Sequence, residues 1–331
     1  MSITVIIPTY NEEKFIQQAI DSASFADEIL VIDSYSTDQT IAIVEQNNCT
    51  LFQRKFDNFS NQKNYAIERA QHDWVMILDA DELLLPNAQN EIQNAITKEG
   101  YVAFQIPRHN FFINTFLAFG SNRKEKLTRV FNRNYCKYKG LVHEQIVYNG
   151  NLGTLNNFMF HFTYKNLAHF ISKKNKYSDL QSLQLLKKNK KANFFHILIK
   201  PLFRFFNELI LRRGIFDGVP GLTTTTMNAF GVLSRYIKLR NHQQKTKSEK
   251  LISYNAYVGE IIKDAQESGS ATDKSPSLFF LIFLPILTFF RFYIFKMYFL
   301  KSIDGYALSF LEGFKKYLSL TYRWLSRRNL S

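Results

Sequence analysis

The stretch from Trp74 to Glu82 constrains the fold more than any other part of the chain. It begins with an uninterrupted apolar run, Trp74–Leu78, and ends in the acidic residues Asp79, Asp81 and Glu82. A continuous apolar run is typical of a strand covered on both faces, as in a parallel α/β sheet. Ligands of such sheets bind beyond the carboxyl ends of the strands, so the two aspartates are expected at a binding crevice.

Asp79 and Asp81 are two positions apart in an extended segment, so both carboxylates can reach one hard divalent cation at roughly 2.1 Å. The other coordination positions of such an ion would be left for water and phosphate oxygens. An Asp-x-Asp pair alone is weak evidence, because carboxylates at strand ends are also common as caps and turn residues. Whether the pair binds a metal ion or only caps the strand therefore has to be judged from the segments that precede it.

Two strand–helix units precede this stretch. The apolar run Ile3–Ile7 is stopped by Pro8, and helical spacing of apolar residues follows over Glu12–Ser22. A second apolar run, Glu28–Asp33, is followed by helical spacing over Thr40–Gln46. This alternation predicts a parallel sheet with right-handed crossovers. Neither strand is followed by a glycine-rich phosphate loop, which argues against a Rossmann fingerprint or a P-loop.

Asp33 ends the second predicted strand and is expected to face the same crevice as Asp79. A carboxylate there can accept hydrogen bonds from a base or from ribose hydroxyls. A role for Asp33 as an N-cap or turn residue stays open. An amphipathic helix over Phe59–Ala70 leads into the Trp74 strand, and Lys63 near its N-terminus can reach a diphosphate or remain a solvated lysine.

Several motifs, taken in order, resemble those of the family 2 glycosyltransferases, which have the GT-A fold. They are Pro8–Glu13, Val31–Asp33 with Ser36–Asp38, Gln62–Asn64 and Leu78–Glu82. Further matches resemble the subgroup of lipopolysaccharide-core glucosyltransferases that add a β-linked sugar to a core heptose, namely Lys126–Phe131, Gly140–Glu144 and His161. The resemblance extends over roughly residues 1 to 240.

The resemblance implies an α/β fold of the GT-A type, with a mostly parallel nucleotide-sugar-binding sheet flanked by helices. It also implies a nucleotide-sugar donor such as a UDP-hexose, a Mg²⁺ or Mn²⁺ ion, and inversion at the anomeric carbon. The donor-binding residues expected on this basis are Pro8, Thr9, Asn11, Glu12, Asp33, Lys63, Asp79 and Arg129. The metal ligands expected are Asp81, Asp79 and His161.

An inverting transfer requires a carboxylate that takes the proton of the acceptor hydroxyl on the side of the sugar opposite the leaving diphosphate. We expect Glu144 to be this base and His143 to orient it or to contact the donor. Gly140 permits a turn before them, although a His-Glu pair alone can also be two solvent-exposed residues without a catalytic role. His161 lies in an aromatic segment, Phe158–Phe162, and an ordinary core role for it stays open beside the ligand role.

The formal net charge of +14 is unevenly distributed along the chain. Residues 1–100 carry a net charge of −10 and the remainder carries +24. The basic excess therefore lies outside the acidic site, and an anionic membrane or a nucleic acid is the partner that it favours. Two widely separated cysteines, Cys49 and Cys136, indicate a reducing compartment without a disulfide framework.

From Asn166 onward the chain has helical spacing and is rich in lysine and phenylalanine. Phe194–Leu211 contains Pro201 and Arg204 and is followed by Arg212 and Arg213. Leu278–Phe290 has no charge but is too short to span a bilayer. Aromatic helices in the plane of the membrane, whose cations meet anionic lipid, fit this pattern better. A tilted span and burial in the protein core stay open.

The last segment resembles a second copy of an earlier one. Phe203–Phe205 lies as far before Phe216–Gly218 as Phe290–Phe292 lies before Ile303–Gly305. We therefore expect a catalytic domain in residues 1–165 and a basic, aromatic, helical membrane-docking region in residues 166–240. A polar linker with a helix in residues 241–276 would then join it to a second copy of the docking unit in residues 277–331.

The function expected is transfer of a hexose, from a donor resembling UDP-glucose, to a lipid-linked glycan such as lipopolysaccharide core. Such an enzyme would be peripheral or monotopic at the cytoplasmic face of a bacterial inner membrane. A polyprenyl-phosphate sugar transferase is the nearest alternative, and a non-catalytic membrane scaffold is another. A basic RNA-binding protein would leave Asp33, Asp79 and Asp81 unexplained, so no nucleic-acid partner is expected.

Overall fold

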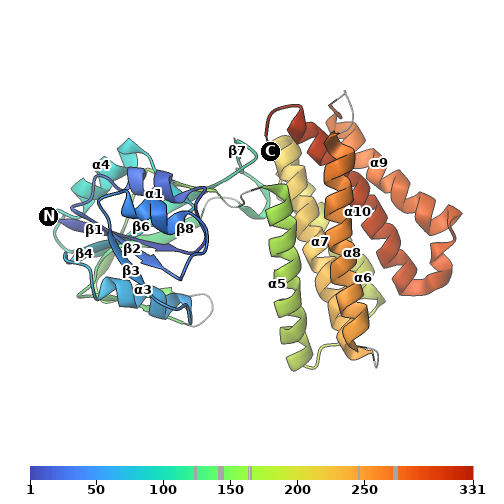
Figure 1. Cartoon of the computed structure of the whole chain (residues 1–331), viewed down its shortest axis with the longest axis horizontal. Coiled ribbons are helices and arrows are strands. Elements are labelled where there is room, and N and C mark those ends of the chain that lie inside the picture. The colour runs from blue at the N-terminus through green and yellow to red at the C-terminus, as the bar shows by residue number, and fades with distance from the viewer. Residues whose placement is uncertain are drawn as a thin grey trace. The chain divides into compact units, whose positions relative to one another are not determined.

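The computed structural model describes residues 1–122, 125–140, 145–162, 164, 166–244, 247–270 and 275–330. The chain divides into two compact units (Figure 1). The first consists of residues 1–111 and 123–163, and the second consists of residues 112–122 and 164–331.

The first unit is built around a mixed sheet in which neighbouring strands run in the order β3, β2, β1, β4, β8, β6, β12 and β5. β1 pairs in parallel with β2 and β4, β2 with β3, and β6 with β12 and β11. β8 is antiparallel to β4 and β6. The strands are β1 (Ile3–Thr9), β2 (Glu28–Asp33), β3 (Thr50–Gln53), β4 (Trp74–Ile77), β5 (Glu82–Leu84), β6 (Tyr101–Phe112), β8 (Glu125–Asn132), β11 (Asn151–Thr154) and β12 (Met159–Phe162).

Helices cover both faces of this sheet, as the continuous apolar runs predict. Alternate residues of a strand point to opposite faces, so Ile7 of β1 packs in one apolar cluster and Ile6 in another. The first cluster includes Ile16 of α1 and Ile92 of α4, and the second includes Ala66 of α3. The helices are α1 (Ile16–Ser22), α2 (Thr40–Glu45), α3 (Phe59–Ile67) and α4 (Pro86–Ala95), and a separate hairpin is formed by β9 (Cys136–Lys139) and β10 (Gln145–Tyr148).

The second unit is helical (Figure 1). α7 packs against α5 and α6, and α10 packs against α8 and α9. The segment expected as a polar linker thus contains α8, a long helix that lies along α10. The elements are β7 (Thr115–Phe116), α5 (Leu167–Lys187), α6 (Phe194–Phe206), α7 (Gly218–Gln243), α8 (Lys247–Ser270), α9 (Leu278–Phe290) and α10 (Ser302–Ser326).

The backbone of the second unit repeats itself. α6 and α9 each contain a proline, Pro201 and Pro285, and each continues into a π-helical turn, Asn207–Leu211 or Arg291–Phe295. A residue with left-handed backbone follows in each copy, Arg213 at φ 59° or Met297 at φ 55°. A 3₁₀ turn then leads into α7 or α10, at Gly214–Asp217 or Tyr298–Lys301.

These matching features lie 84 positions apart, as Pro201 and Pro285 show. The alignment made from the sequence, which pairs Phe203 with Phe290, is therefore wrong by three residues. Aromatic residues recur at nearly every turn of both helices, so neighbouring registers look alike in sequence. The backbone turns are unambiguous, and at this register Phe230 meets its own equivalent, Phe314, with the rings stacked 4.4 Å apart.

Both copies expose apolar side chains at matching positions on α6, α9 and the turns after them. We call this set the apolar face. It comprises the pairs Phe195 and Phe279, Ile199 and Phe283, Leu202 and Ile286, Phe203 and Leu287, Phe206 and Phe290, Ile210 and Ile294, Leu211 and Phe295, Ile215 and Phe299, and Phe216 and Leu300. By length and composition alone, Leu278–Phe295 could cross a membrane, with a mean hydropathy of 2.2 and only 6 % of its residues buried.

Candidate active site

The carboxyl ends of β1, β2 and β4 bring acidic residues from separate segments to one edge of the sheet. Asp33 is the last residue of β2 and lies in register with Thr9, the last residue of β1. Beyond β4, the Leu78 amide donates to the Ile6 carbonyl at 3.0 Å, so the chain stays beside β1 until it reaches Asp79. This is the arrangement expected for a site at the ends of parallel strands.

Asp33 is buried and bonded across the turn that follows it. Its carboxylate accepts from the Ser36 amide at 2.9 Å, from the Ser36 hydroxyl at 2.5 Å, and from Nε2 of Gln53 at 3.2 Å. The turn role that the sequence left open is therefore real. It holds the carboxylate rigidly at the end of β2.

The loop after β1 is tied to the loop after β2. Asn11 has a left-handed backbone, with φ 55°, and its side-chain oxygen accepts from the Thr37 amide at 2.7 Å. The next amide, of Glu12, donates to Oγ1 of Thr40 at 2.8 Å. Pro8 and Thr9 lie within β1, and the buried Thr9 hydroxyl has no hydrogen-bond partner among the described residues. A buried hydroxyl of this kind is costly unless a ligand satisfies it.

Asp79 lies between two cations. Its Oδ2 is 2.6 Å from Nη2 of Arg129, and its Oδ1 is 3.9 Å from Nζ of Lys63. The same Arg129 nitrogen lies 2.8 Å from Oε1 of Glu82, which also pairs with Arg108 at 3.2 Å. The two cations that were expected to face a diphosphate are thus held in ion pairs with Asp79, and Lys63 makes the looser pair.

Burial and charge act in opposite directions on these carboxyls. Burial raises the pKa of Asp79, but the positive charges of Arg129 and Lys63 outweigh it and hold that pKa well below its usual range. Burial also raises the pKa of Glu82, and there the nearby Asp79 charge adds to the effect. Arg129, between the two acids, has its pKa raised well above the usual value. The guanidinium is therefore a fixed positive charge beneath the site.

Asp81 faces His161 from the other side of the same turn. Oδ2 of Asp81 is 3.4 Å from Nε2 of His161, and Nδ1 of His161 is 2.7 Å from Oδ1 of Asn110. The strand β12 produces this arrangement, because it pairs with β6 on one side and β5 on the other, placing His161 in register with Asn110 and Glu82.

Asp81 and His161 together suit a divalent ion. A separation of 3.4 Å lets a carboxylate oxygen and an imidazole nitrogen share one ion at ordinary bond lengths of about 2.1 Å. Protein histidines that bind metals usually give their second ring nitrogen to a fixed oxygen, as His161 does to Asn110. Asp79 is taken by its cations, and no cluster of three His, Cys, Asp or Glu side chains suited to a metal occurs in the described ranges.

Glu144 and His143, the expected base and its neighbour, lie outside the described residues. Gly140, three positions before His143 in the chain, is held by α3, because the Ser60 hydroxyl donates to the Gly140 carbonyl at 2.5 Å. Lys63, three residues along α3, has its Nζ 5.1 Å from the centre of the Tyr138 ring.

The sequence did not indicate the roles of Glu82 and Asn110. Glu82 follows the Asp-x-Asp pair directly, yet nothing in its position shows that it is buried beneath two arginines. Asn110 is 51 residues from His161, and only the parallel pairing of β6 with β12 brings them together. The available signal was a polar residue, Asn110, directly before the two phenylalanines Phe111 and Phe112.

Comparison with known proteins agrees with this geometry. The model of Glycosyl transferase family 2 matches residues 4–148. A glycosyltransferase of Rickettsia conorii is 29 % identical over 265 residues, which cover 74 % of this chain and 92 % of that protein. The lipopolysaccharide core biosynthesis glycosyltransferase LpsC of Rhizobium meliloti is 26 % identical over 65 % of this chain and 83 % of its own length.

Among solved structures, glucosyl-3-phosphoglycerate synthase from Mycobacterium tuberculosis, in complex with Mn²⁺, UDP and phosphoglyceric acid, is 22 % identical. The match covers 33 % of this chain and 43 % of that one, with a TM-score of 0.30. The family match includes the motifs at the ends of β1, β2 and β4. Residues 4–148 therefore form a family 2 glycosyltransferase domain of GT-A fold, which confirms the family resemblance drawn from the sequence for this part of the chain.

Proposed function

We propose that this glycosyltransferase moves a hexose, with inversion, from a nucleotide sugar such as UDP-glucose to a lipid-linked glycan such as lipopolysaccharide core. The observation that carries the proposal is the placement of Asp33, Asp79 and Asp81 after β2 and β4, the two parallel neighbours of β1, with Asp81 facing His161. A sugar nucleotide needs both a base-and-ribose contact and a charge-compensated diphosphate contact. One edge of this sheet offers residues for both.

The nucleoside end of the donor is assigned to β1 and β2. The rigid Asp33 carboxylate and the unsatisfied Thr9 hydroxyl suit hydrogen bonds to the base or the ribose. Pro8 lies beside Thr9 at the end of β1, and Asn11 and Glu12 belong to the loop that would close over the nucleoside. That loop is held by the Thr37 and Thr40 contacts.

The diphosphate end is assigned to Asp81, His161 and Lys63. Asp81 and His161 would hold a Mg²⁺ or Mn²⁺ ion, which neutralises charge on the departing diphosphate when bound. Nζ of Lys63 lies 3.9 Å from Oδ1 of Asp79, so Lys63 brings a positive charge to the end of β4, where the diphosphate would bind. Arg129 orients Asp79 and contributes a fixed positive field from below.

Glu144 is proposed to take the proton of the acceptor hydroxyl, with His143 orienting it. Gly140, four positions before Glu144 in the chain, is tied by the Ser60 hydroxyl to α3, the helix that also carries Lys63. The need for a general base distinguishes a glycan hydroxyl from a polyprenyl phosphate as the acceptor. A free hydroxyl needs a base, whereas a polyprenyl phosphate is already anionic and needs none.

The acceptor is proposed to be lipid-linked because the helical unit suits a membrane surface. The apolar face is far larger than the single exposed apolar residues common on soluble proteins. Arg212, Arg213, Arg291, Lys296 and Lys301 are exposed within or beside it. Aromatic helices flanked by cations bind in the plane of anionic membranes, and this supports the proposal that the enzyme acts at the cytoplasmic face of a bacterial inner membrane.

The test is a transfer assay with purified full-length protein, a panel of nucleotide sugars, and lipid-linked acceptors, with and without Mn²⁺ or Mg²⁺. We expect one UDP-hexose to be consumed only when the metal is present. Glu144→Gln should lower transfer to a glycan hydroxyl by at least 100-fold and leave donor binding intact. A silent Glu144→Gln, with transfer to polyprenyl phosphate, would establish the alternative acceptor. Absence of transfer from every donor would contradict the proposal.

A further inference from the structure

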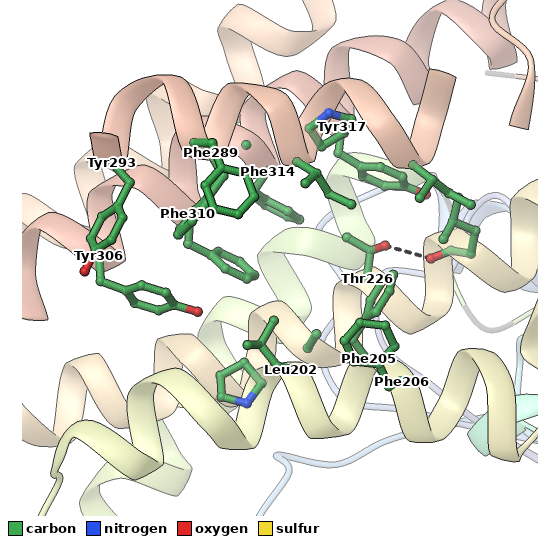
Figure 2. A pocket seen from close by; sticks show the side chains of 18 of the residues that line it. Leu202, Phe205, Phe206, Thr226, Phe289, Tyr293, Tyr306, Phe310, Phe314 and Tyr317 are labelled. Carbon is green, nitrogen blue, oxygen red and sulfur yellow. Dashed lines mark hydrogen bonds between the residues drawn. The ribbon is translucent and has the colours of Figure 1, made fainter. Parts of the chain in front are cut away.

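A cavity of about 600 Å³ lies between the two copies of the helical repeat. It is enclosed by α6 and α7 of one copy and by α9 and α10 of the other (Figure 2). Its walls come from equivalent residues of the two copies, including Pro201 and Pro285, Phe205 and Phe289, and Phe206 and Phe290. The cavity therefore follows the approximate symmetry of the repeat and is not an accidental packing fault.

Two of the few polar side chains in its walls are bonded within the protein. The Thr226 hydroxyl donates to the backbone oxygen of Leu222 at 2.8 Å (Figure 2). The Tyr317 hydroxyl shares a hydrogen bond with the Thr223 hydroxyl at 2.9 Å. Water needs two to four polar partners to occupy a cavity, and these walls offer few. Because protein interiors otherwise leave few voids larger than a water molecule, a space of this size and character suits an apolar ligand.

The cavity also opens onto the apolar face. Leu202, Phe206, Ile286 and Phe290 line it and belong to that face as well, with Leu202 39 % and Ile286 47 % exposed. A ligand therefore enters from whatever medium covers the face. On the function proposed above, on which this step rests, that medium is the hydrocarbon of a lipid membrane.

We propose that this cavity binds one hydrocarbon chain of a membrane lipid. At about 30 Å³ per methylene, close to the share of a water molecule in the liquid, the volume accommodates roughly 20 methylenes. That is one chain and not two. A chain drawn out of the bilayer between α6 and α9 would hold the lipid to the protein, beyond the adsorption that the apolar face alone provides.

The experiment measures binding of cis-parinaric acid, an 18-carbon fluorescent fatty acid, to the full-length protein in detergent-free buffer without any sugar donor. Saturated fatty acids of 8 to 20 carbons are then used to displace it. We expect one chain bound per protein. The affinity should rise about fourfold for each added methylene until the cavity is full, and then level off.

Ala229→Trp is the blocking variant, because Ala229 is buried in the wall of the cavity and its enlargement fills the space. It should weaken binding at least tenfold. The matched control is the double variant Phe216→Ser with Leu300→Ser, whose side chains are equivalent, exposed and outside the cavity. The control should bind fatty acid as the wild type does but bind anionic vesicles less.

Three outcomes would overturn the proposal: no binding, several chains per protein with no length limit, or undiminished binding by a folded Ala229→Trp. If Ala229→Trp does not fold, displacement from the wild type by fatty acids of 8 to 20 carbons still tests whether the cavity binds one chain of limited length. Since no donor is present, failure here leaves the proposed transfer activity untouched, and failure of transfer leaves this result standing.

Discussion

Oδ2 of Asp81 lies 3.4 Å from Nε2 of His161, although the two residues are 80 positions apart. Asp81 follows β4 and precedes β5, and His161 lies on β12, which pairs with β5. The pairing of these short strands therefore creates the candidate ion site. The other ring nitrogen of His161 is held by Asn110 at 2.7 Å, so the orientation of the imidazole is set before any ion arrives.

Asn110→Leu should weaken binding of Mn²⁺ in the presence of UDP by about 10- to 100-fold, because His161 loses the oxygen that fixes its ring. Asn110→Asp, which keeps that oxygen, should restore most of the affinity. Calorimetric titration of Mn²⁺ into each variant gives the comparison. Equal affinities for Asn110→Leu and the wild type would show that the contact does not position His161.

Glu82→Gln should destabilise the first unit by about 3 kcal/mol, because the buried Arg129 and the partly buried Arg108 lose the carboxylate charge that they share. Chemical unfolding monitored by circular dichroism measures the change. Glu125→Gln is the control, since Glu125 pairs with Arg108 from an exposed position and its loss should change stability by less than about 1 kcal/mol. Similar effects of the two variants would contradict the buried role of Glu82.

Asp79 should stabilise the fold over most of the acidic range. Its pKa in the folded protein lies well below the unfolded value of about 3.9, so its contribution is complete above about pH 5, where the unfolded chain is ionised as well. It is lost only as the pH falls further, through the folded pKa. The difference in unfolding free energy between the wild type and Asp79→Asn should therefore be constant from pH 8 to pH 5 and shrink below pH 4. A difference that shrinks between pH 7 and pH 5 would contradict this.

The repeat predicts a stabilising substitution. Ser302 begins α10 with φ 54° and ψ −132°, and its equivalent in the first copy is a glycine, Gly218, at φ 63° and ψ −138°. A side chain in this conformation costs about 1 kcal/mol or more. Ser302→Gly should therefore raise the unfolding temperature, and Gly218→Ser should lower it. If the two changes had the same sign, the equivalence of the two positions would fail.

Much of the first unit could be predicted because its elements are local. The apolar run Glu28–Asp33 is β2, and Ile3–Ile7 lies within β1, as expected. The helix predicted from Glu12 begins instead at Ile16, because the amides of Phe15 and Ile16 both bond to the Glu12 carbonyl in a turn. A pattern of apolar positions cannot distinguish a first helical turn from the turn that leads into it.

The contacts that complete the site could not be predicted. The ion pairs among Lys63, Asp79, Glu82 and Arg129 join α3, the end of β4 and β8, and depend on how these elements pack. The repeat was visible in sequence, but its register was not, since aromatic residues recur on successive turns. The π-helical turns and the left-handed residues Arg213 and Met297, which fix the register, have no sequence signature here.

The proposal that Asp81 and His161 hold a divalent ion beside the donor is tested most directly by titrating Mn²⁺ into the full-length protein at saturating UDP. The electron paramagnetic resonance signal reports the Mn²⁺ that stays free. We expect one Mn²⁺ ion bound per chain, and only when UDP is present. Asp81→Asn should lower the affinity for Mn²⁺ at least 100-fold, whereas Asp21→Asn, an exposed control, should bind as the wild type does. Undiminished binding by Asp81→Asn, or no binding by the wild type, would contradict the proposal.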